Sequence, residues 1–337
     1  MAKSKNSDYN YLHANSRIWE MERRLLKADT LDRMIDYTSN EEMSKTLGEY
    51  GYEVGVLGSP SGALEEAIAQ NRAKIFDELG AMAPDRRLID IFRVKYDYHN
   101  IKAVLKGNLS GDDAERVMVD FGRFPARAAR EALIRESQGV LSETAFAGAN
   151  DAREVLAKTG DAQLADIALD RAMYSEMAGL ALEAGSAFLG GYVRLIIDAA
   201  NLRTLVRSVM MGKDVEFVRA GLIEGGNIAG EAIVSIGDIT GSLANGLYSF
   251  TPLEAAAAEG LSAIKEQSLL TRFEKLCDDA LTGYLRGAHT HSFGEAPLIA
   301  FIAAKEAETV AIRTIVSGRL AGVPGDEIRE RVRSTYV

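Results

Sequence analysis

The chain has 337 residues, a hydrophobic content of 47% and a formal net charge of −10. This length predicts two or three domains, and the composition is that of a folded protein rather than a disordered one. The acidic balance argues against nucleic-acid binding and against adsorption to anionic lipid, because both need basic patches. It favours partners that are basic proteins.

The composition also bears on the compartment and on the type of secondary structure. The only cysteine, Cys277, leaves no internal disulfide and fits a reducing compartment, and we interpret it as a small core residue. Residues 1–10 lack an apolar run, so we expect no signal peptide. The most apolar region, 178–200, is interrupted by charged residues and is too broken for a membrane span. These features together predict a cytoplasmic protein. We expect it to be largely helical, because prolines are few and Ala, Leu, Glu and Arg are abundant.

The first third of the chain predicts three helices. Apolar side chains at helical spacing predict a helix over residues 9–27. A second is expected over 61–79, after the turn GSPSG, with Ser61 as its N-cap. Pro84 opens a third helix that runs to Gly107, and Asp85 adds early negative charge that suits the helix dipole.

The remaining two thirds repeat this plan. A long helix is expected over 161–184, another over 269–285, and a short one from Pro324 to the end. Residues 251–254, Thr-Pro-Leu-Glu, form a capping box at the start of a further helix. The stretch 233–246 is the most loop-like. Since no stretch alternates with period two between turn signals, we predict an all-α fold.

One helical pattern occurs three times: as RVKYDYHNIKAVLKG, as RLIIDAANLRTLVRS, and as the degraded copy AKEAETVAIRTIVSG. The first two copies are offset by 198 − 97 = 101 residues, and the third by a further 308 − 198 = 110. The aligned polar positions are Arg93, Asp97, Asn100 and Lys102; Arg194, Asp198, Asn201 and Arg203; and Glu308 and Arg313. This period is too long for a solenoid. It predicts three similar helical units, at residues 1–122, 123–224 and 225–337.

Each signature helix also carries an apolar stripe, which we expect to pack on the preceding helix. The stripe residues are Val94, Tyr98, Ile101 and Leu105 in the first copy, and Leu195, Ala199, Leu202 and Val206 in the second. The repeated polar row indicates a shared structural role. Its Asp and Asn side chains can accept hydrogen bonds from a neighbouring helix N-terminus or loop, and its Arg and Asp can pair along the helix. A catalytic or metal-binding carboxylate is the alternative.

Known catalytic and ligand-binding motifs are missing from the sequence. There is no Glu-x-x-His pair for a two-metal bundle site, and His289-x-His291 has no third ligand at suitable spacing. GLIEGGNIAG lacks the lysine of a P-loop, and GSPSG has proline where a nucleophile elbow needs serine. We therefore expect no catalytic, cofactor-binding or metal-binding residue, and interpret the chain as a non-catalytic scaffold.

Three motifs in order resemble one family. KYDYHNIKAVLKG (95–107), the opening YNYLHANSRIWEMERRLL and the ending from Glu295 to Val337 resemble the C subunits of V/A-type rotary ATPases, the family that includes the d subunit of eukaryotic V-ATPases. One departure is Ala311, which stands where that family more often has asparagine. The third copy is therefore expected to lack one hydrogen bond.

The resemblance implies a funnel of three similar helical domains about a pseudo-threefold axis. It implies a monomeric, non-catalytic rotor subunit that joins the central-stalk subunits, of D and F type, to the membrane rotor ring during ATP-linked proton or sodium transport. The chain would lie in the cytoplasm, attached to the membrane through the complex. Two alternatives remain open, a generic helical adaptor and a soluble helical enzyme with an unrecognised site. Neither accounts for the three ordered motifs.

Overall fold

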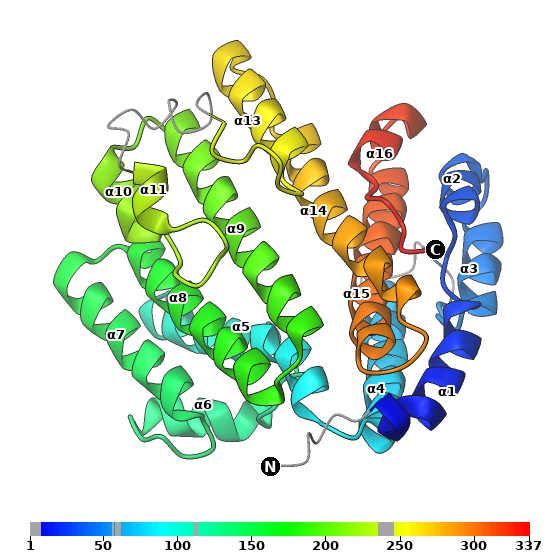
Figure 1. Ribbon diagram of the computed structural model, residues 1–337, viewed down its shortest axis with the longest axis horizontal. Helices are drawn as coiled ribbons and strands as arrows, with labels where there is room; N and C mark the ends of the chain where they lie inside the picture. The colour runs from blue at the N-terminus through cyan, green and yellow to red at the C-terminus, as the bar shows by residue number, and fades with distance from the viewer. Residues whose placement is uncertain (1–7, 56, 58–61, 111–113, 235–245) are drawn as a thin grey trace. The chain divides into compact units, whose positions relative to one another are not determined.

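The computed structural model describes residues 8–55, 57, 62–110, 114–234 and 246–337 (Figure 1). The all-α prediction is confirmed, because these described residues form helices and no β-strand. The α-helices are α1 Leu12–Glu22, α2 Ala28–Asp36, α3 Asn40–Glu49, α4 Ala63–Met82, α5 Arg87–Ser110, α6 Ala126–Ile134, α7 Glu143–Thr159, α8 Ala162–Ala184, α9 Ala187–Met210, α10 Val215–Gly221, α11 Gly230–Val234, α13 Glu254–Glu266, α14 Thr271–Arg286, α15 Ala296–Leu320 and α16 Gly325–Arg331. Short 3₁₀ helices are η1 Asp8–Tyr11, η2 Ala114–Arg116 and η3 Gly287–Thr290.

The chain divides into two compact units. Unit 1 joins both ends of the sequence, Met1–Ile89 with Tyr248–Val337, and unit 2 is the middle, Asp90–Leu247. The boundary at residue 89 falls inside the first turns of α5. The finer division into three similar units stays a prediction.

Unit 2 is built around a core that surrounds the first signature helix, α5. Its stripe residues Val94, Tyr98, Ile101 and Leu105 are buried together with side chains from α6, α7 and α8. Alanines dominate the contribution of α7, where Ala145, Ala149 and Ala152 are fully buried. Such small side chains let the α7 backbone approach its neighbours closely, as a close-packed interior requires.

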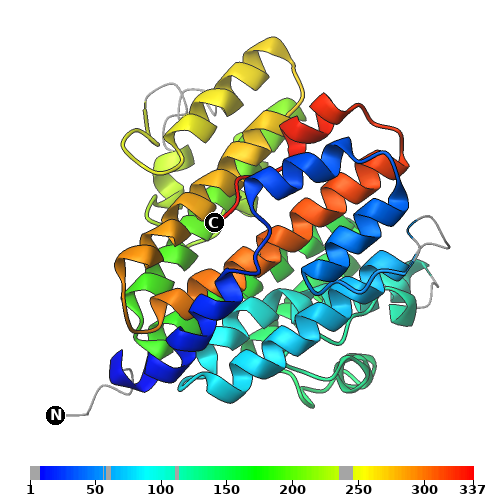
Figure 2. The same ribbon diagram turned by 90° about the vertical axis from the view of Figure 1, so that its right-hand side faces the viewer.

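Unit 1 is built around a core that surrounds the third signature helix, α15. Ala311, Ile312, Ile315 and Val316 of α15 are buried with side chains from α2, α3 and α4. Ile328 of α16 completes this core. Figure 2 shows α15, drawn in orange, lying beside the blue helices from the start of the chain. The two ends of the sequence therefore share one hydrophobic interior.

The expectation that the signature stripe packs on the preceding helix is wrong for α5. Its stripe is buried with α6, α7 and α8, which all follow it in the chain. Periodicity shows that a helix has a buried face, but it carries no information on which neighbour covers that face. The burial itself was predicted correctly, since Val94 and Ile101 are 0% exposed, as are Leu202 and Val206 of α9.

Helix ends differ from the sequence expectation by a few residues. α4 begins at Ala63 after Gly62, whereas Ser61, the expected N-cap, lies outside the described residues. α5 begins at Arg87, and Asp85 Oδ1 accepts a hydrogen bond from Arg87 N at 3.0 Å. Among the described helices, six were not anticipated: α2, α3, α6, α7, α10 and α11. Most of the loop-like stretch 233–246 lies outside the described residues.

Candidate functional site

The acidic and asparagine positions of the repeated polar row are buried in the signature helices. Asp97 and Asn100 on α5, Asp198 and Asn201 on α9, and Glu308 on α15 are each at most 6% exposed. Burying a polar side chain without a partner is unfavourable, so each of them must be hydrogen-bonded inside the protein. Their partners identify what the repeat does.

Asp97 holds the loop that follows α5. Its Oδ1 accepts hydrogen bonds from the backbone N–H groups of Arg123 at 2.8 Å and Phe124 at 3.3 Å. Its Oδ2 accepts the Arg123 guanidinium Nε at 2.6 Å. One carboxylate thus fixes the backbone and the side chain of the same loop residue.

Asp198 holds the loop that follows α9 by a related set of contacts. Its Oδ1 accepts the backbone N–H of Ile228 at 3.0 Å, and its Oδ2 accepts the side-chain amide of Asn227 at 2.7 Å. The partner loops are offset by 228 − 124 = 104 residues, close to the 101-residue offset of the helices. Asn227 therefore takes the part that Arg123 plays beside Asp97.

The two asparagines tie the same loops by two hydrogen bonds each. Asn100 donates to the carbonyl of Val119 at 2.8 Å and accepts its N–H at 2.9 Å. Asn201 donates to the carbonyl of Ile223 at 2.8 Å and accepts its N–H at 2.8 Å. An amide that satisfies both backbone groups of one residue replaces the pairing that a strand neighbour would give.

Two glycines allow the carboxylates to approach so closely. A Cβ atom on Gly122 would lie 2.1 Å from Asp97 Oδ1, and one on Gly226 would lie 2.2 Å from Asp198 Oδ1. Both distances are far below van der Waals contact, so only glycine fits at these positions. The loops read VDFGRFP at 119–125 and IEGGNIA at 223–229, and their alignment could have revealed them as a second motif shared by the first two copies of the repeat.

The tie at Asp97 extends into a buried ionic network. Arg123 Nη2 lies 2.9 Å from Glu176 Oε1 on α8, and Tyr98 donates to Glu176 Oε2 at 2.9 Å. Burial raises the pKa of the Asp97 carboxyl, and the adjacent Arg123 guanidinium opposes that rise. Burial and the Glu176 carboxylate raise the pKa of the Tyr98 hydroxyl, so Tyr98 remains a hydrogen-bond donor. Two carboxylates share one guanidinium here, which makes the network a stiff link between α5, its loop and α8.

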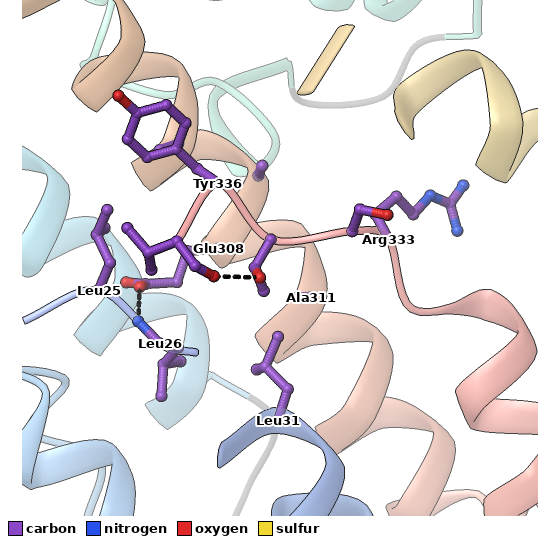
Figure 3. A pocket seen from close by; sticks show the side chains of 12 residues that line it. Leu25, Leu26, Leu31, Glu308, Ala311, Arg333 and Tyr336 are labelled. Carbon is purple, nitrogen blue, oxygen red and sulfur yellow. Dashed lines mark hydrogen bonds between the residues drawn. The ribbon is translucent and has the colours of Figure 1, made fainter. Parts of the chain in front are cut away.

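Glu308 of the third copy makes the corresponding tie to the beginning of the chain. Its Oε2 accepts the backbone N–H of Leu26 at 2.6 Å, and its Oε1 accepts the hydroxyl of Tyr52 at 2.7 Å. Lys305, one turn earlier on α15, forms an ion pair with the same carboxylate. Figure 3 shows the Glu308 carboxylate directed at Leu26. Leu26 precedes α2, just as Phe124 precedes α6 and Ile228 precedes α11.

The structure explains why Ala311 can replace asparagine. Val119, the partner of Asn100, lies 124 − 119 = 5 residues before Phe124. The residue at the same spacing before Leu26 is Met21, which lies within α1. Helix α1 already supplies backbone partners there, and Met21 O accepts the N–H of Arg24 at 3.0 Å. Ala311 instead borders a cavity of about 20 Å³ that is also lined by Leu25, Glu308 and the C-terminal residues. Without a backbone pair to satisfy, an amide has no function at this position.

The C-terminal residues 332–337 form an extended strap over the Glu308 tie. Arg333 Nε donates to Asp278 at 2.9 Å, and Ser334 N donates to Asp279 at 2.7 Å, both on α14. Tyr336 is 5% exposed, and its ring stacks on His289 with centroids 4.6 Å apart. Its hydroxyl is hydrogen-bonded to Glu22, whose pKa is raised by burial. The strap therefore joins α1, η3 and α14.

The basic positions of the repeat also reach neighbouring elements. Lys102 on α5 pairs with Asp170 of α8 at 2.6 Å, and Arg313 on α15 pairs with Glu65 of α4 through two hydrogen bonds. Arg93 Nε donates to the carbonyl of Phe121 at 3.2 Å, and Arg194 Nε to Asn227 Oδ1 at 3.1 Å. Arg203 is half-buried on α9.

These contacts follow one order through the sequence. Each signature helix binds a loop. For two of them the helices after that loop pack on the signature helix, since α5 receives α6 to α8 and α15 receives α2 to α4. For α15 the next loop in order is the first loop of the chain. The sequence of ties thus runs from α5 to the loop before α6, from α9 to the loop before α11, and from α15 back to the loop before α2.

This chemistry is structural rather than catalytic. The carboxylates of Asp97, Asp198 and Glu308 are occupied by protein donors, and no group of three potential metal ligands occurs in the described ranges. Cys277 is 0% exposed, as expected of a core residue. In the part of the chain that the structure describes, no helix is both long and apolar enough to cross a membrane.

In this all-α fold the repeated carboxylates accept hydrogen bonds from loops, which is the chemistry of a structural protein rather than of an enzyme. Comparison with known proteins identifies its family. Residues 14–331 match the family described as ATP synthase (C/AC39) subunit. The chain belongs to this family.

Two relatives illustrate the similarity. The C subunit of the V-type sodium ATPase of Enterococcus hirae is 25% identical over 330 residues, covering 97% of this chain and 99% of the relative. The C subunit of the A-type ATP synthase of Haloferax volcanii is 30% identical over 300 residues, covering 83% of this chain and 84% of the relative. The chain is accordingly a non-catalytic subunit of a V/A-type rotary ATPase complex.

Proposed function

We propose that the chain is the rotor socket of this complex. It would receive the central stalk, made of D- and F-type subunits, and sit on the membrane rotor ring, so that torque passes between ATP turnover and proton or sodium transport. It would act as one copy per complex, in the cytoplasm, attached to the membrane through its partners. Family membership supports the complex, and the tie pattern supports the mechanical role.

The observation that carries this proposal is the cyclic order of the ties. Three signature helices each bind the loop that begins the next group of helices, and the last binds the first, through Glu308 and Leu26. Such an order is what a pseudo-threefold funnel of three similar units requires. It supports the prediction that Asp97, Asp198 and Glu308 occupy equivalent places in those units.

Stiffness is the second argument. A torque-carrying part must not deform locally, and buried charge-assisted hydrogen bonds are shorter and stronger than neutral ones. Asp97, Asp198 and Glu308 each convert a loop, ordinarily the most mobile part of a fold, into a bonded extension of a helix. A subunit that transmits torque needs rigid loops, whereas a soluble binding adaptor does not.

Reconstitution tests the proposal. Purified chain is mixed with the D- and F-type stalk heterodimer at low salt, and binding is followed by biolayer interferometry while the salt is raised. We expect binding that weakens with salt, because exposed charges are screened within about 8 Å at physiological ionic strength. The chain alone should show no ATPase activity. Absence of stalk binding at every salt concentration would point to a generic adaptor and contradict the proposal.

A further inference from the structure

The cavity beside Ala311 has room for one very small molecule. In sequence, Ala311 aligns with Asn100 and Asn201 of the other two copies. The cavity has a volume of about 20 Å³ and is bounded by α15, by the loop before α2 and by the C-terminal strap (Figure 3). About 10–15 Å³ of such volume is enough for a water molecule. The cavity therefore admits one water molecule and no organic ligand.

Three buried polar groups of the residues that line this cavity have a hydrogen-bonding position to spare. Glu308, which is 6% exposed, uses Oε2 for Leu26 N, and that oxygen keeps a second lone pair. Tyr336 is 5% exposed, and no group among the described residues accepts from its backbone N–H. Leu26 is 2% exposed, and no described donor reaches its carbonyl. Buried backbone groups that lack a protein partner are normally paired with ordered water.

We propose that one ordered water molecule binds in this cavity and takes the place of the asparagine amide of the other two copies. Asn100 and Asn201 each donate one hydrogen bond and accept another. A water molecule has the same double capacity, since it makes about three hydrogen bonds when buried. Here it accepts from the Tyr336 N–H and donates to Glu308 Oε2 and to the Leu26 carbonyl. It thereby joins α15 to residues from both ends of the chain.

The orientation of the strap supports this assignment. Figure 3 shows the Tyr336 ring directed away from Glu308, so this residue lines the cavity with its backbone. The strap is fixed there by Arg333 and Ser334, which bond to α14. A backbone N–H held in this way beside a carboxylate that has a free lone pair is a site that a single water can bridge.

Charge selects water over an ion. Lys305 already pairs with the Glu308 carboxylate, and Arg333 lines the cavity, so a cation would meet two positive side chains. An anion would meet the Glu308 carboxylate itself. The two remaining groups are a donor, the Tyr336 N–H, and an acceptor, the Leu26 carbonyl. A neutral molecule that both donates and accepts satisfies all three groups.

A high-resolution crystal structure of the isolated chain tests the proposal directly. We expect one density peak within about 2.7–3.2 Å of both Tyr336 N and a Glu308 carboxylate oxygen. In solution, the same water should give a magnetisation-transfer peak between the water resonance and the Tyr336 amide proton. A structure that resolves other buried waters but no density in this cavity would overturn the proposal. A peak that contacts oxygen atoms only would identify a cation and would equally overturn it.

A pair of variants tests the polarity of the cavity independently. Ala311→Thr and Ala311→Val add side chains of the same shape, but only threonine brings an oxygen that can replace the water. Valine leaves the buried polar groups without a partner. We therefore expect a higher urea midpoint for Ala311→Thr than for Ala311→Val. Val310→Thr, at a position of α15 that is 44% exposed, measures the intrinsic difference between the two side chains. A threonine advantage no larger at 311 than at 310 would show a dry, apolar cavity and contradict the proposal.

Discussion

Leu26 N donates a hydrogen bond to Glu308 Oε2 at 2.6 Å, although 282 residues separate the two in the sequence. Tyr52 and Lys305 bind the same carboxylate. The bond belongs to a core in which α2, α3 and α4 surround α15. The beginning and the end of the chain are therefore parts of one cooperative structure, and changes at either end should be felt at the other.

Gly122 and Gly226, which lie against the carboxylates of the two aspartates, give the most direct test of the hydrogen bonds between helix and loop. Gly122→Ala and Gly226→Ala each place a Cβ 2.1 to 2.2 Å from a carboxylate oxygen. We expect each to lower the free energy of unfolding by about 1–3 kcal/mol, the usual cost of overpacking. Urea denaturation followed by circular dichroism measures it.

Gly179→Ala on α8 is the control for that experiment, because no atom lies within 4 Å of its added Cβ. Alanine is a better helix former than glycine, so this variant should gain about 0.5–1 kcal/mol. Equal effects of all three substitutions would show that the loops do not depend on glycine.

The asparagine ties predict a large effect from a small truncation. Asn201→Ala leaves the N–H and the carbonyl of Ile223 without their partner in a buried site. Each unsatisfied group costs about 1–3 kcal/mol, so we expect the two together to lower the stability by about 2–6 kcal/mol. Hydrogen exchange of the Ile223 amide should accelerate as well. Asn150→Ala, which removes only the exposed contact with Arg153, should change the stability by less than about 0.5 kcal/mol.

Asp97→Ala should destabilise the protein without altering any catalytic property. It removes the acceptor of Arg123 N, Phe124 N and the Arg123 guanidinium, and it leaves those donors buried. The loss should be on the order of 1–3 kcal/mol. An unchanged urea midpoint would contradict the structural role of this carboxylate.

Glu22 gives the protein a pH-dependent element at the C-terminal strap. Burial raises its pKa above 4.5, so the folded state holds a proton that the unfolded state has already released. The stability gained by that proton is complete below pH 4.5 and is lost as the pH rises through the raised pKa. Glu22→Gln keeps an acceptor for Tyr336 but does not titrate, so its stability relative to wild type should increase as the pH rises above that value. Urea midpoints at a series of pH values measure this, with exposed Glu53→Gln as the control that should track wild type throughout.

The strap itself should stabilise the N-terminal helices. Tyr336→Ala removes a buried ring that stacks on His289 and binds Glu22. We expect a loss of about 3–5 kcal/mol, together with faster hydrogen exchange in α2. Tyr9→Ala, where the ring is 81% exposed, should be neutral. Destabilisation confined to α14, with α2 unaffected, would contradict the link between the two ends.

Repetition and periodicity in the sequence were enough to predict the all-α fold and the buried stripes of α5 and α9. They could not predict that the stripe of α5 would be covered by later helices, because a period carries no partner information. Gly122 and Gly226 were missed since their requirement comes from a carboxylate that folding brings near. The short helices α2, α3 and α6, each of 9 or 10 residues, were missed because so few turns leave only a weak periodic signal.

The left-handed backbone of Phe250, with φ at +61°, was equally hidden, because such a backbone is expected at glycine or asparagine and not at phenylalanine. The capping box predicted with Thr251 as N-cap is wrong, because α13 begins at Glu254 and its N-cap is Leu253, which makes no side-chain capping hydrogen bond. Thr251 Oγ1 accepts Leu253 N at 3.2 Å, while Glu254 reaches back to Phe250 N, one residue earlier than the motif implies.

The core that α2 to α4 share with α15 has a consequence for how the protein is made. Ile68 leaves the ribosome 311 − 68 = 243 residues before Ala311, its companion in that core. At about 5–20 residues per second this delay is roughly 12–50 s. During that time Leu31, Met34 and Leu47 have no α15 to cover them, whereas the core around α5 can already close. The nascent N-terminal helices should therefore need a chaperone until the last helices emerge.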